Sequence, residues 1–368
     1  MGTLNSYFSL TKPRVVILLQ ITALCSVLSH DLIGESGVSM ETLKIMSIVM
    51  IGGYLTAGGA NAINMWYDRD IDPIMTRTSN RPLSTGEIEA NSALVFGILM
   101  SIGGIIWFSL LTNYVATFWA VFSILFYVLI YSMFLKRKTP QNIVVGGIAG
   151  STPPLIGWAA AENNLVIETS SIKSFLESII YLGPHDFLGS FPLMPWFMFI
   201  LIFLWTPPHF WALALYRSKE YEKVGVPMMP NVKGKARTLT EMKIYSILLI
   251  LLSLIAFINY TPTDKWIRFD EWASTNYLIS VNTTILSIWY ATTVWKIDVH
   301  EKIDERGRMS IASRSFYVSL LYLALMFIIL VIGSLGFEGA VVGLVIVLIS
   351  IYRSEWSKKK VSTEVNNN

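Results

Sequence analysis

The sequence predicts an all-α, polytopic transmembrane helical bundle of nine to ten spans, from its composition, its apolar runs and its loop charges. Of its 368 residues, 53% are hydrophobic and only 14% charged, whereas soluble domains average about 25% charged residues. The apolar residues form continuous runs of about 20, the length that crosses the hydrocarbon core of a bilayer. These runs do not alternate as the strands of a membrane barrel would.

Ten stretches are long and apolar enough to qualify as spans, or nearly so. They are residues 14–33, 43–66, 91–111, 114–135, 142–161, 194–216, 239–260, 276–297, 315–333 and 337–352. The last stretch is short, and an interfacial helix is the alternative for it. The long outer loop 162–192 contains a candidate amphipathic helix, SIKSFLESIIYL. We expect one domain over 1–368, with 337–352 and a basic tail, 353–368, at its end.

The loop charges test this map of spans. When successive loops are assigned to alternate sides, 24 of the 28 Lys and Arg residues lie on the side of both termini, and the other side has only Lys44, Lys173, Lys265 and Arg268. Cytoplasmic loops carry the excess of basic residues, so both termini are expected in the cytoplasm. With no presequence pattern at the N-terminus, a prokaryotic inner (plasma) membrane is expected.

The remaining composition limits the chemistry. The single cysteine, Cys25, excludes an internal disulfide framework. Four scattered histidines are too few for a histidine-rich metal site. We expect the lipid bilayer as a partner of the chain, and no nucleic acid.

An Asp-rich motif follows the second span. Asn64, Asp68 and Asp72 are spaced at i, i+4 and i+8, so on a continuous helix they would lie within about 80° of arc, with Asp70 on roughly the opposite side. Carboxylate and amide oxygens suit Mg²⁺, which usually binds one or two carboxylates together with substrate phosphate oxygens. The motif therefore predicts a magnesium site made by Asn64, Asp68 and Asp72.

Two arginines, Arg77 and Arg81, follow the acids, with Asn80 beside them. The planar fork of arginine matches phosphate oxygens, so we expect Arg77, Arg81 and Asn80 to contact a diphosphate. Magnesium and arginine together would stabilise that group as it leaves carbon. The alternative is an ordinary helix end with solvated charges, but ionisable residues at membrane depth are costly and usually functional.

A second polar motif follows the sixth span, which exits on the same side as the second. Arg217 and Lys219 are candidates to neutralise phosphate, Tyr221 is a candidate substrate contact, and Glu220 is a tentative second magnesium ligand. Simple topogenic charge is the alternative for the two bases, and an ion pair with a neighbouring lysine is the alternative for Glu220. Because both exits face the same side, we expect the two motifs to converge on one ligand.

The flanking strings resemble a known family. The pattern N-x-x-x-D-x-x-x-D followed by R-T-x-x-R-P-L, beginning at Asn64, resembles the first motif of the UbiA superfamily of membrane prenyltransferases. The string W-T-P-P-H-F-W-A-L-A, beginning at Trp205, is similar to the protoheme IX farnesyltransferase (heme O synthase) branch. The similarity covers a core of about 10–333. The chain departs from the branch at Glu220, where an aspartate is usual, in its long outer loop, and in the extra stretch 337–352.

The resemblance implies a bundle of UbiA-prenyltransferase type with a central cavity. It implies Mg²⁺-dependent transfer of a farnesyl group from farnesyl diphosphate to a vinyl group of protoheme IX (heme B), giving heme O for heme–copper oxidases. Heme A synthase or terminal oxidase assembly proteins are the partners implied. His209 becomes a candidate heme contact, with a hydrogen-bonded bundle residue as its alternative, because heme iron is often held by histidine. The basic run Lys136-Arg137-Lys138 could meet phosphate or heme propionates, with Lys138 as the candidate contact and topogenic charge as the alternative.

Two other functions share some of these features. A prenyltransferase acting on a quinone precursor or other lipid acceptor would use the same diphosphate site and differ in its acceptor pocket. A membrane transporter or heme-handling protein is the alternative of another class. Few charges lie within the spans, which disfavours the transporter.

Overall fold

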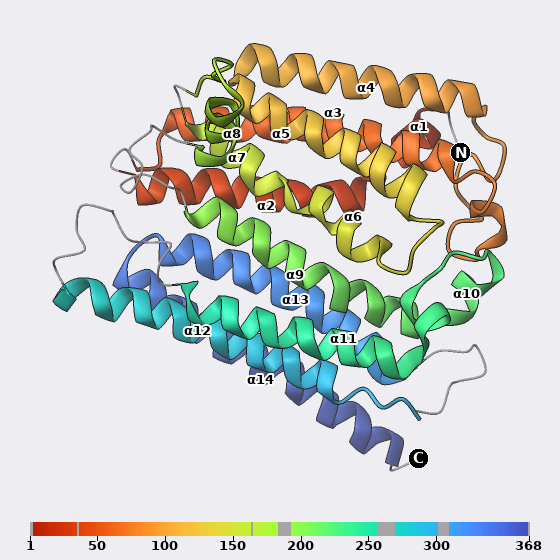
Figure 1. The fold of residues 1–368 in the computed structure, drawn as a ribbon. Helices are drawn as coiled ribbons and strands as arrows, with labels where there is room; N and C mark the ends of the chain where they lie inside the picture. The colour runs from red at the N-terminus through yellow and green to blue at the C-terminus, as the bar shows by residue number, and fades with distance from the viewer. Residues whose placement is uncertain are drawn as a thin grey trace.

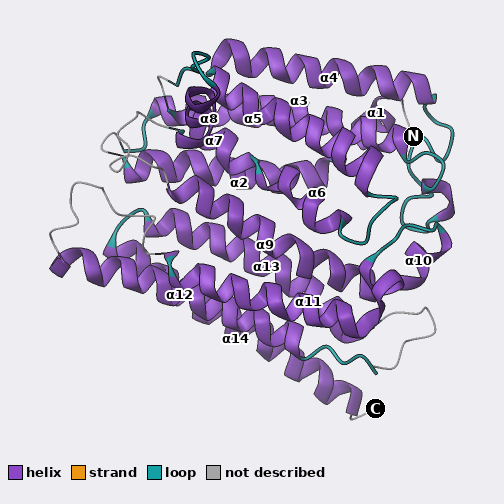
Figure 2. Ribbon diagram, in the orientation of Figure 1, coloured by secondary structure: helices purple, strands orange, loops and turns teal. Residues whose placement is uncertain are grey.

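The computed structural model describes residues 3–34, 37–162, 165–182, 193–256, 269–300 and 309–366. Within these residues every regular element is a helix (Figure 2). The elements are α1 (Thr3–Leu10), α2 (Pro13–Ile33), α3 (Met40–Tyr67), η1 (Asp72–Ile74), α4 (Ala90–Leu111), α5 (Tyr114–Leu125), η2 (Phe126–Leu135), α6 (Asn142–Ser151), α7 (Pro153–Ala161), α8 (Ile172–Tyr181), α9 (Leu193–Tyr216), α10 (Ser218–Lys223), α11 (Met229–Leu254), α12 (Phe269–Trp295), α13 (Ser310–Gly333) and α14 (Phe337–Asn366).

Eight segments of the described chain are long and apolar enough to cross a membrane. They are Pro13–Ile33, Met40–Tyr67, Ala90–Leu111, Tyr114–Leu135, Asn142–Ala161, Leu193–Tyr216, Ser310–Gly333 and Phe337–Trp356. The other two predicted spans correspond to α11 and α12, helices of 26 and 27 residues that carry more polar side chains. The stretch 337–352 lies within α14, a helix of 30 residues. Its length and apolar window favour a span over an interfacial helix.

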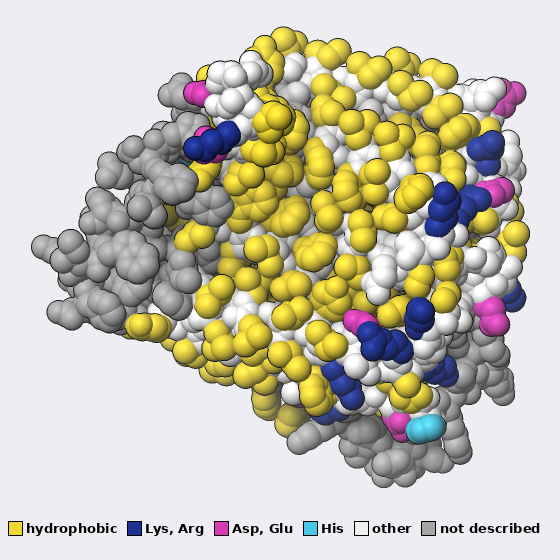
Figure 3. Space-filling view, in the orientation of Figure 1, with side chains coloured by type: hydrophobic (Ala, Val, Ile, Leu, Met, Phe, Trp, Pro, Cys, Tyr) yellow, Lys and Arg dark blue, Asp and Glu magenta, His cyan; other side chains and the backbone are white. Residues whose placement is uncertain are grey.

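The long helices lie side by side, with α3, α4 and α5 at one edge of the bundle and α12 and α14 at the other (Figure 1). Both chain ends and α10 lie at one end of the bundle, and α8 lies at the opposite end. Apolar side chains cover the middle of the visible face, while most of its visible Lys and Arg side chains gather at the end with the termini (Figure 3). This distribution agrees with the charge asymmetry read from the sequence.

Glycines let the helices that carry the site approach closely. A Cβ atom on Gly59 of α3 would lie 2.6 Å from the carbonyl oxygen of Gly97 on α4. A Cβ atom on Gly157 of α7 would lie 2.3 Å from the carbonyl oxygen of Ala23 on α2. Small residues at such contacts allow backbones to pack together where lipid supplies little hydrophobic driving force. These glycines therefore allow close packing of α3 on α4 and of α7 on α2.

The predicted amphipathic helix of the outer loop is present as α8. Ser171 caps its first turn by accepting a hydrogen bond from the Ser174 backbone N–H. The indole of Trp119 on α5 donates to the Ile179 carbonyl at 3.0 Å, which ties α8 to the bundle. Residues 163–164 and 183–192 of that loop lie outside the described residues.

Candidate active site

The Asp-rich motif begins at the end of α3. The helix stops at Tyr67, Asp68 is its C-terminal cap, and Asp72 opens the short 3₁₀ helix η1. The prediction that Asn64, Asp68 and Asp72 share one face of a continuous helix is therefore wrong. Proline disfavours helical geometry in the residue before it, and Pro73 follows Asp72 directly.

The turn after α3 nevertheless buries two of the acids together. Asp68 is 0% exposed and Asp72 is 2% exposed, although both are charged side chains. The Asp72 backbone N–H donates to the Asp68 carbonyl at 3.0 Å, so one turn joins them. Asp70 lies apart, with its side chain 56% exposed. Buried carboxylates need partners because desolvation of an isolated charge is very costly.

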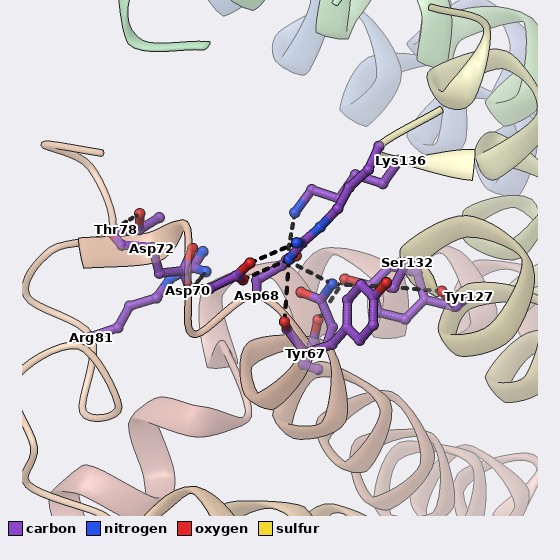
Figure 4. A network of polar contacts seen from close by, with 12 residues as sticks. Tyr67, Asp68, Asp70, Asp72, Thr78, Arg81, Tyr127, Ser132 and Lys136 are labelled. Carbon is purple, nitrogen blue, oxygen red and sulfur yellow. Dashed lines mark hydrogen bonds and ion pairs between the residues drawn. The ribbon is translucent and has the colours of Figure 1, made fainter. Parts of the chain in front are cut away.

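Asp68 is at the centre of the polar network in Figure 4. Its Oδ2 accepts a hydrogen bond from Asn64 Nδ2 at 3.1 Å and another from the ammonium of Lys136. Its Oδ1 is buried and lacks a hydrogen bond within the described structure, although Arg137 Nη2 lies 3.7 Å away. A buried carboxylate oxygen left open in this way is available to a ligand or metal ion.

Asn64 connects three elements. Lys12, between α1 and α2, donates from Nζ to Asn64 Oδ1 at 2.6 Å. Asn64 Nδ2 also donates to Ser132 Oγ of η2 at 3.0 Å. The predicted metal-facing oxygen of Asn64 is thus bonded to an ammonium group in this structure.

Asp72 is paired with Arg81. Arg81 Nη1 donates to Asp72 Oδ2 at 2.5 Å, and the Thr78 hydroxyl donates to the Asp72 carbonyl at 2.8 Å. Arg77 and Asn80 are exposed, and neither side chain has a hydrogen bond or ion pair with the described part of the chain. The two predicted arginines therefore differ: Arg81 holds the loop, and Arg77 is free to reach an incoming anion.

The segment η2 positions Lys136 and Arg137, two bases of the run from which only Lys138 was chosen as a site residue. It is a π-helix of ten residues, and the Lys136 backbone N–H donates to the carbonyl of Tyr131, five residues earlier. Such helices are rare and frequently occur at functional sites. In this register Lys136 reaches Asp68, while the ammonium of Lys138 lies 4.3 Å from the Phe134 ring. The structure thus brings Lys136 into the network and leaves the predicted Lys138 outside it.

Arg137 binds the Asp-rich loop through the partly exposed Asp70. Its guanidinium makes two hydrogen bonds of 2.7 Å to the carboxylate of Asp70 and lies 4.9 Å from the Tyr67 ring. The hydrogen bond from Arg137 is the largest cause that holds the pKa of Asp70 below its ordinary value. The same bond raises the pKa of Arg137. A bidentate pair of this kind fixes geometry as well as charge.

The site carries more positive than negative charge. Four bases surround three carboxylates: Lys12, Arg81, Lys136 and Arg137 against Asp68, Asp70 and Asp72. Burial lowers the pKa of Lys12 well below its ordinary value. Arg81 and Lys136 add to that decrease, and Asp68 and Asp72 oppose it. An excess of partly buried basic side chains raises the local affinity for an anion.

The second motif lies against the first. Ile71, from the Asp-rich loop, and Tyr221, from α10, pack against one apolar cluster, whose buried members are Ile143, Ala214, Val226 and Met228. The two motifs are therefore neighbours in the fold, and their convergence on one ligand stays a prediction. The Arg217 guanidinium lies 5.6 Å from the Tyr216 ring. The side chains of Lys219 and Glu220 lie outside the described residues.

His209 has the environment of a packing residue. Its ring lies between Trp205 and Phe316, with centroids 4.2 and 4.6 Å away, and Nδ1 is 2.6 Å from the Ser319 hydroxyl. Both ring faces are covered and the residue is 6% exposed. This geometry favours the hydrogen-bonded bundle residue over the heme contact.

The donor set fits a metal ion that arrives with phosphate. In the described chain, no group of three or more His, Cys, Asp or Glu side chains could hold a metal ion. Two carboxylates with one open oxygen suit Mg²⁺ only when a substrate supplies further oxygen ligands. The described acidic side chains therefore fit Mg²⁺ only in combination with oxygen ligands from another molecule.

Known proteins share this sequence and fold. The model of the UbiA prenyltransferase family matches residues 32–312. Protoheme IX farnesyltransferases from Parvibaculum lavamentivorans and Bartonella bacilliformis are 37% and 35% identical to the chain. The first alignment covers 92% of each protein, and the second covers 90% of this chain and 91% of the relative.

Solved structures give the same fold. The UbiA homologue from Aeropyrum pernix matches with a TM-score of 0.58 at 16% identity, over 91% of this chain and 98% of that one. The UbiA homologue from Archaeoglobus fulgidus, bound to GPP and Mg²⁺, matches with a TM-score of 0.51 at 15% identity, over 89% and 99%. The chain belongs to the UbiA prenyltransferase family of multi-pass membrane proteins, in its protoheme IX farnesyltransferase branch.

Proposed function

We propose that the protein transfers a farnesyl group from farnesyl diphosphate to a vinyl group of heme B and so makes heme O. The observation that carries this proposal is the cation-rich network around the buried Asp68 and Asp72. The site lies at the end of the bundle where the termini and most of the visible basic side chains gather (Figures 1 and 3). In our proposal this end faces the cytoplasm of a prokaryotic cell, and the chain lies in the inner (plasma) membrane.

Asp68 and Asp72 would hold Mg²⁺ together with the diphosphate, and Glu220 is the tentative further ligand. Asn64, the other predicted ligand, would act by orienting Asp68, because its own oxygen is bonded to Lys12. The open Oδ1 of Asp68 supports this assignment, as does the A. fulgidus homologue bound to GPP and Mg²⁺. When bound, Mg²⁺ would neutralise phosphate charge as the bond to carbon breaks.

The bases would hold the diphosphate in place. Lys136 lies on Asp68 and would contact a ligand at this carboxylate. Arg77 is exposed on the same loop and is the other proposed contact. The remaining predicted contacts, all from the two motifs, are Asn80, Arg81, Arg217, Lys219 and Tyr221. Such preorganised cations stabilise the negative charge that develops on the leaving group.

The chemistry needs no protein nucleophile. The carbon–oxygen bond of farnesyl diphosphate breaks, diphosphate leaves with the electron pair, and an allylic cation remains. The heme vinyl group attacks that cation and forms the new carbon–carbon bond. Water then adds to the resulting heme-side cation as a hydroxyl group, and its proton is released. A central apolar cavity would exclude water until the carbon–carbon bond has formed.

The proposal includes a single domain over 1–368. The main apolar core supports it, since its buried residues run from Ala23 of α2 to Val347 of α14. Assembly with heme A synthase or a terminal oxidase belongs to the proposal as a further expectation.

Purified full-length protein, supplied with heme B, farnesyl diphosphate and Mg²⁺, tests the function directly. Mass spectrometry of the extracted heme should show the hydroxylated farnesyl adduct, and omission of Mg²⁺ should abolish it. A matched reaction with a quinone precursor in place of heme B should give no product. Prenylation of the quinone precursor but not of heme would contradict the proposal.

A further inference from the structure

The hinge between α1 and α2 consists of Thr11 and Lys12, and Lys12 has an unusual backbone conformation. Lys12 has left-handed backbone angles, φ 51° and ψ 60°, and Leu182 is the other non-glycine residue with positive φ in the described chain. Residues with a Cβ atom avoid this region because of steric contact with the backbone. Strain of this kind persists only where the surroundings determine the conformation, and it is concentrated at functional sites.

The surroundings of the hinge do determine it. Asn61 Nδ2 of α3 donates to the Thr11 carbonyl at 3.1 Å, and the Thr11 hydroxyl lies 2.9 Å from the hydroxyl of Tyr54. Leu10, at the end of α1, is fully buried against Met65 and its neighbours on α3. The hinge is therefore fastened to the same helix that carries the Asp-rich motif.

The lysine ammonium decides how the Asn64 amide is oriented. The ammonium form of lysine has three donors and no acceptor, and Lys12 Nζ donates to the Asn64 oxygen Oδ1 at 2.6 Å. The amide NH₂ then faces Asp68 Oδ2 at 3.1 Å and Ser132 Oγ at 3.0 Å. A flipped amide would bring two oxygens together at Asp68 and two donors together at Lys12.

We propose that Lys12 is a positioning residue of the diphosphate site, which acts by fixing the Asn64 amide and, through it, the carboxylate of Asp68. With Oδ2 held by Asn64 and Lys136, the Asp68 Oδ1 is left open for the metal–diphosphate complex. Lys12 is not a catalytic residue in this account, since its described contact is with Asn64. The inference rests on the proposed function, because it assumes that a metal–diphosphate complex is the ligand of Asp68.

The substitution Lys12→Met removes the donor and keeps most of the side-chain length. Binding of Mn²⁺ to the purified full-length protein with inorganic diphosphate, followed by electron paramagnetic resonance, should weaken about 10-fold or more, as for other partners that orient metal ligands. Lys12→Arg, which also carries only donors, should recover most of the binding. Lys44→Met, which removes an exposed lysine paired with Glu41, should leave binding unchanged.

A double-mutant cycle with Asn64→Ala separates positioning from direct contact. If Lys12 acts through Asn64, the double variant Lys12→Met/Asn64→Ala should bind no more weakly than Asn64→Ala alone. If the double variant instead loses affinity by the product of the two single-variant losses, Lys12 contacts the ligand directly and the inference is overturned. If Lys12→Met does not fold, Lys12→Gln in the same cycle decides, because the loss of binding that it causes must vanish in the Asn64→Ala background.

The readout does not depend on heme or farnesyl diphosphate. Wild-type protein that binds Mn²⁺–diphosphate but makes no heme O would contradict the proposed function and still test Lys12. Wild-type protein that binds no Mn²⁺–diphosphate would overturn the inference together with the site.

Discussion

The two ends of the bundle each hold a cluster of charged side chains, and the two clusters differ in how completely they are satisfied. At the end opposite the Asp-rich motif, His30 bonds through Nδ1 to Asp31 at 2.7 Å and through Nε2 to Glu162 at 3.2 Å. The Thr42 hydroxyl donates to the other Asp31 oxygen at 2.5 Å. This outer cluster joins the ends of α2 and α7 to the start of α3.

The cluster around the Asp-rich motif, called the inner cluster here, has a different balance of charge. Its members are Lys12, Asp68, Asp70, Asp72, Arg81, Lys136 and Arg137. Its bases outnumber its acids, Lys12 is strained, and the buried Asp68 Oδ1 has no hydrogen bond in the described structure. In the outer cluster the acids outnumber the base, and each acid has a partner. An open oxygen among excess cations indicates a site that awaits an anionic ligand with its metal, whereas a satisfied cluster indicates a structural role.

The largest expected effect comes from Asp68→Asn. The substitution keeps the shape of the side chain but removes the charge that would bind the metal, so kcat/KM for heme O formation should fall at least about 100-fold. Initial rates at saturating heme B measure this fall. A variant that keeps more than a tenth of the wild-type value would show that the inner cluster is not the reaction site.

Neighbouring lysines in one basic run sharpen the comparison. Lys136 contacts Asp68 and Lys138 lies over Phe134, so Lys136→Met should raise the KM for farnesyl diphosphate about 10-fold or more and Lys138→Met should raise it far less. The expected size follows from the loss of a charge-assisted contact to phosphate. Equal effects from the two variants would contradict the register that the π-helix imposes.

The outer cluster should respond in stability and not in turnover. Asp31→Asn removes the charge that holds His30 and weakens the acceptor of Thr42, which should cost about 1–2 kcal/mol of unfolding free energy. Thermal unfolding in detergent measures this loss. The specific activity of the protein that remains folded should match the wild type, and a selective loss of activity would instead give the outer cluster a functional role.

The smallest effect concerns the partly exposed Asp70–Arg137 pair. The pKa of Asp70 is lower in the folded state than its ordinary value of 3.8. The contribution of Asp70 to the free energy of unfolding is therefore fully present above the pKa of the unfolded state. It is lost as the pH falls through the pKa of the folded state. Because solvent screens the pair, this contribution is at most about 1 kcal/mol. Asp70→Asn should reduce the melting temperature slightly at neutral pH and not at pH values below both pKa values, and an equal reduction at both would exclude this pairing.

Much of the fold could be predicted from the sequence because lipid imposes simple rules. Continuous apolar runs indicate the helices that span the membrane, and the one-sided basic loops indicate which ends of these helices share a side. The amphipathic pattern of α8 and the apolar stretch in α14 were recognised from the sequence in the same manner. The end of α3 was predicted wrongly because helical spacing was extended past Asp70, although Pro73 was a signal that the helix would end. The run from Phe126 to Leu135 contains no such signal, since its apolar residues suit an α-helix as well as a π-helix.

The site was predicted only in part. The acids and Arg81 are close in sequence, so local spacing found them. Lys12 lies 52 residues from Asn64, and no local pattern joins them, because the contact depends on how α1 and α2 dock on α3. Lys136 was missed in favour of Lys138 because the choice between them depends on the helical register of η2.

Magnesium-dependent diphosphate release is the most direct test of the account. Purified full-length wild-type protein, given farnesyl diphosphate and heme B, should release diphosphate with Mg²⁺ and stop when the metal is chelated. Asp68→Asn should release almost none under the same conditions, while Asp31→Asn should release it at the wild-type rate. Release that persists in Asp68→Asn, or that fails equally in Asp31→Asn, would contradict the claim that the inner cluster alone holds the diphosphate.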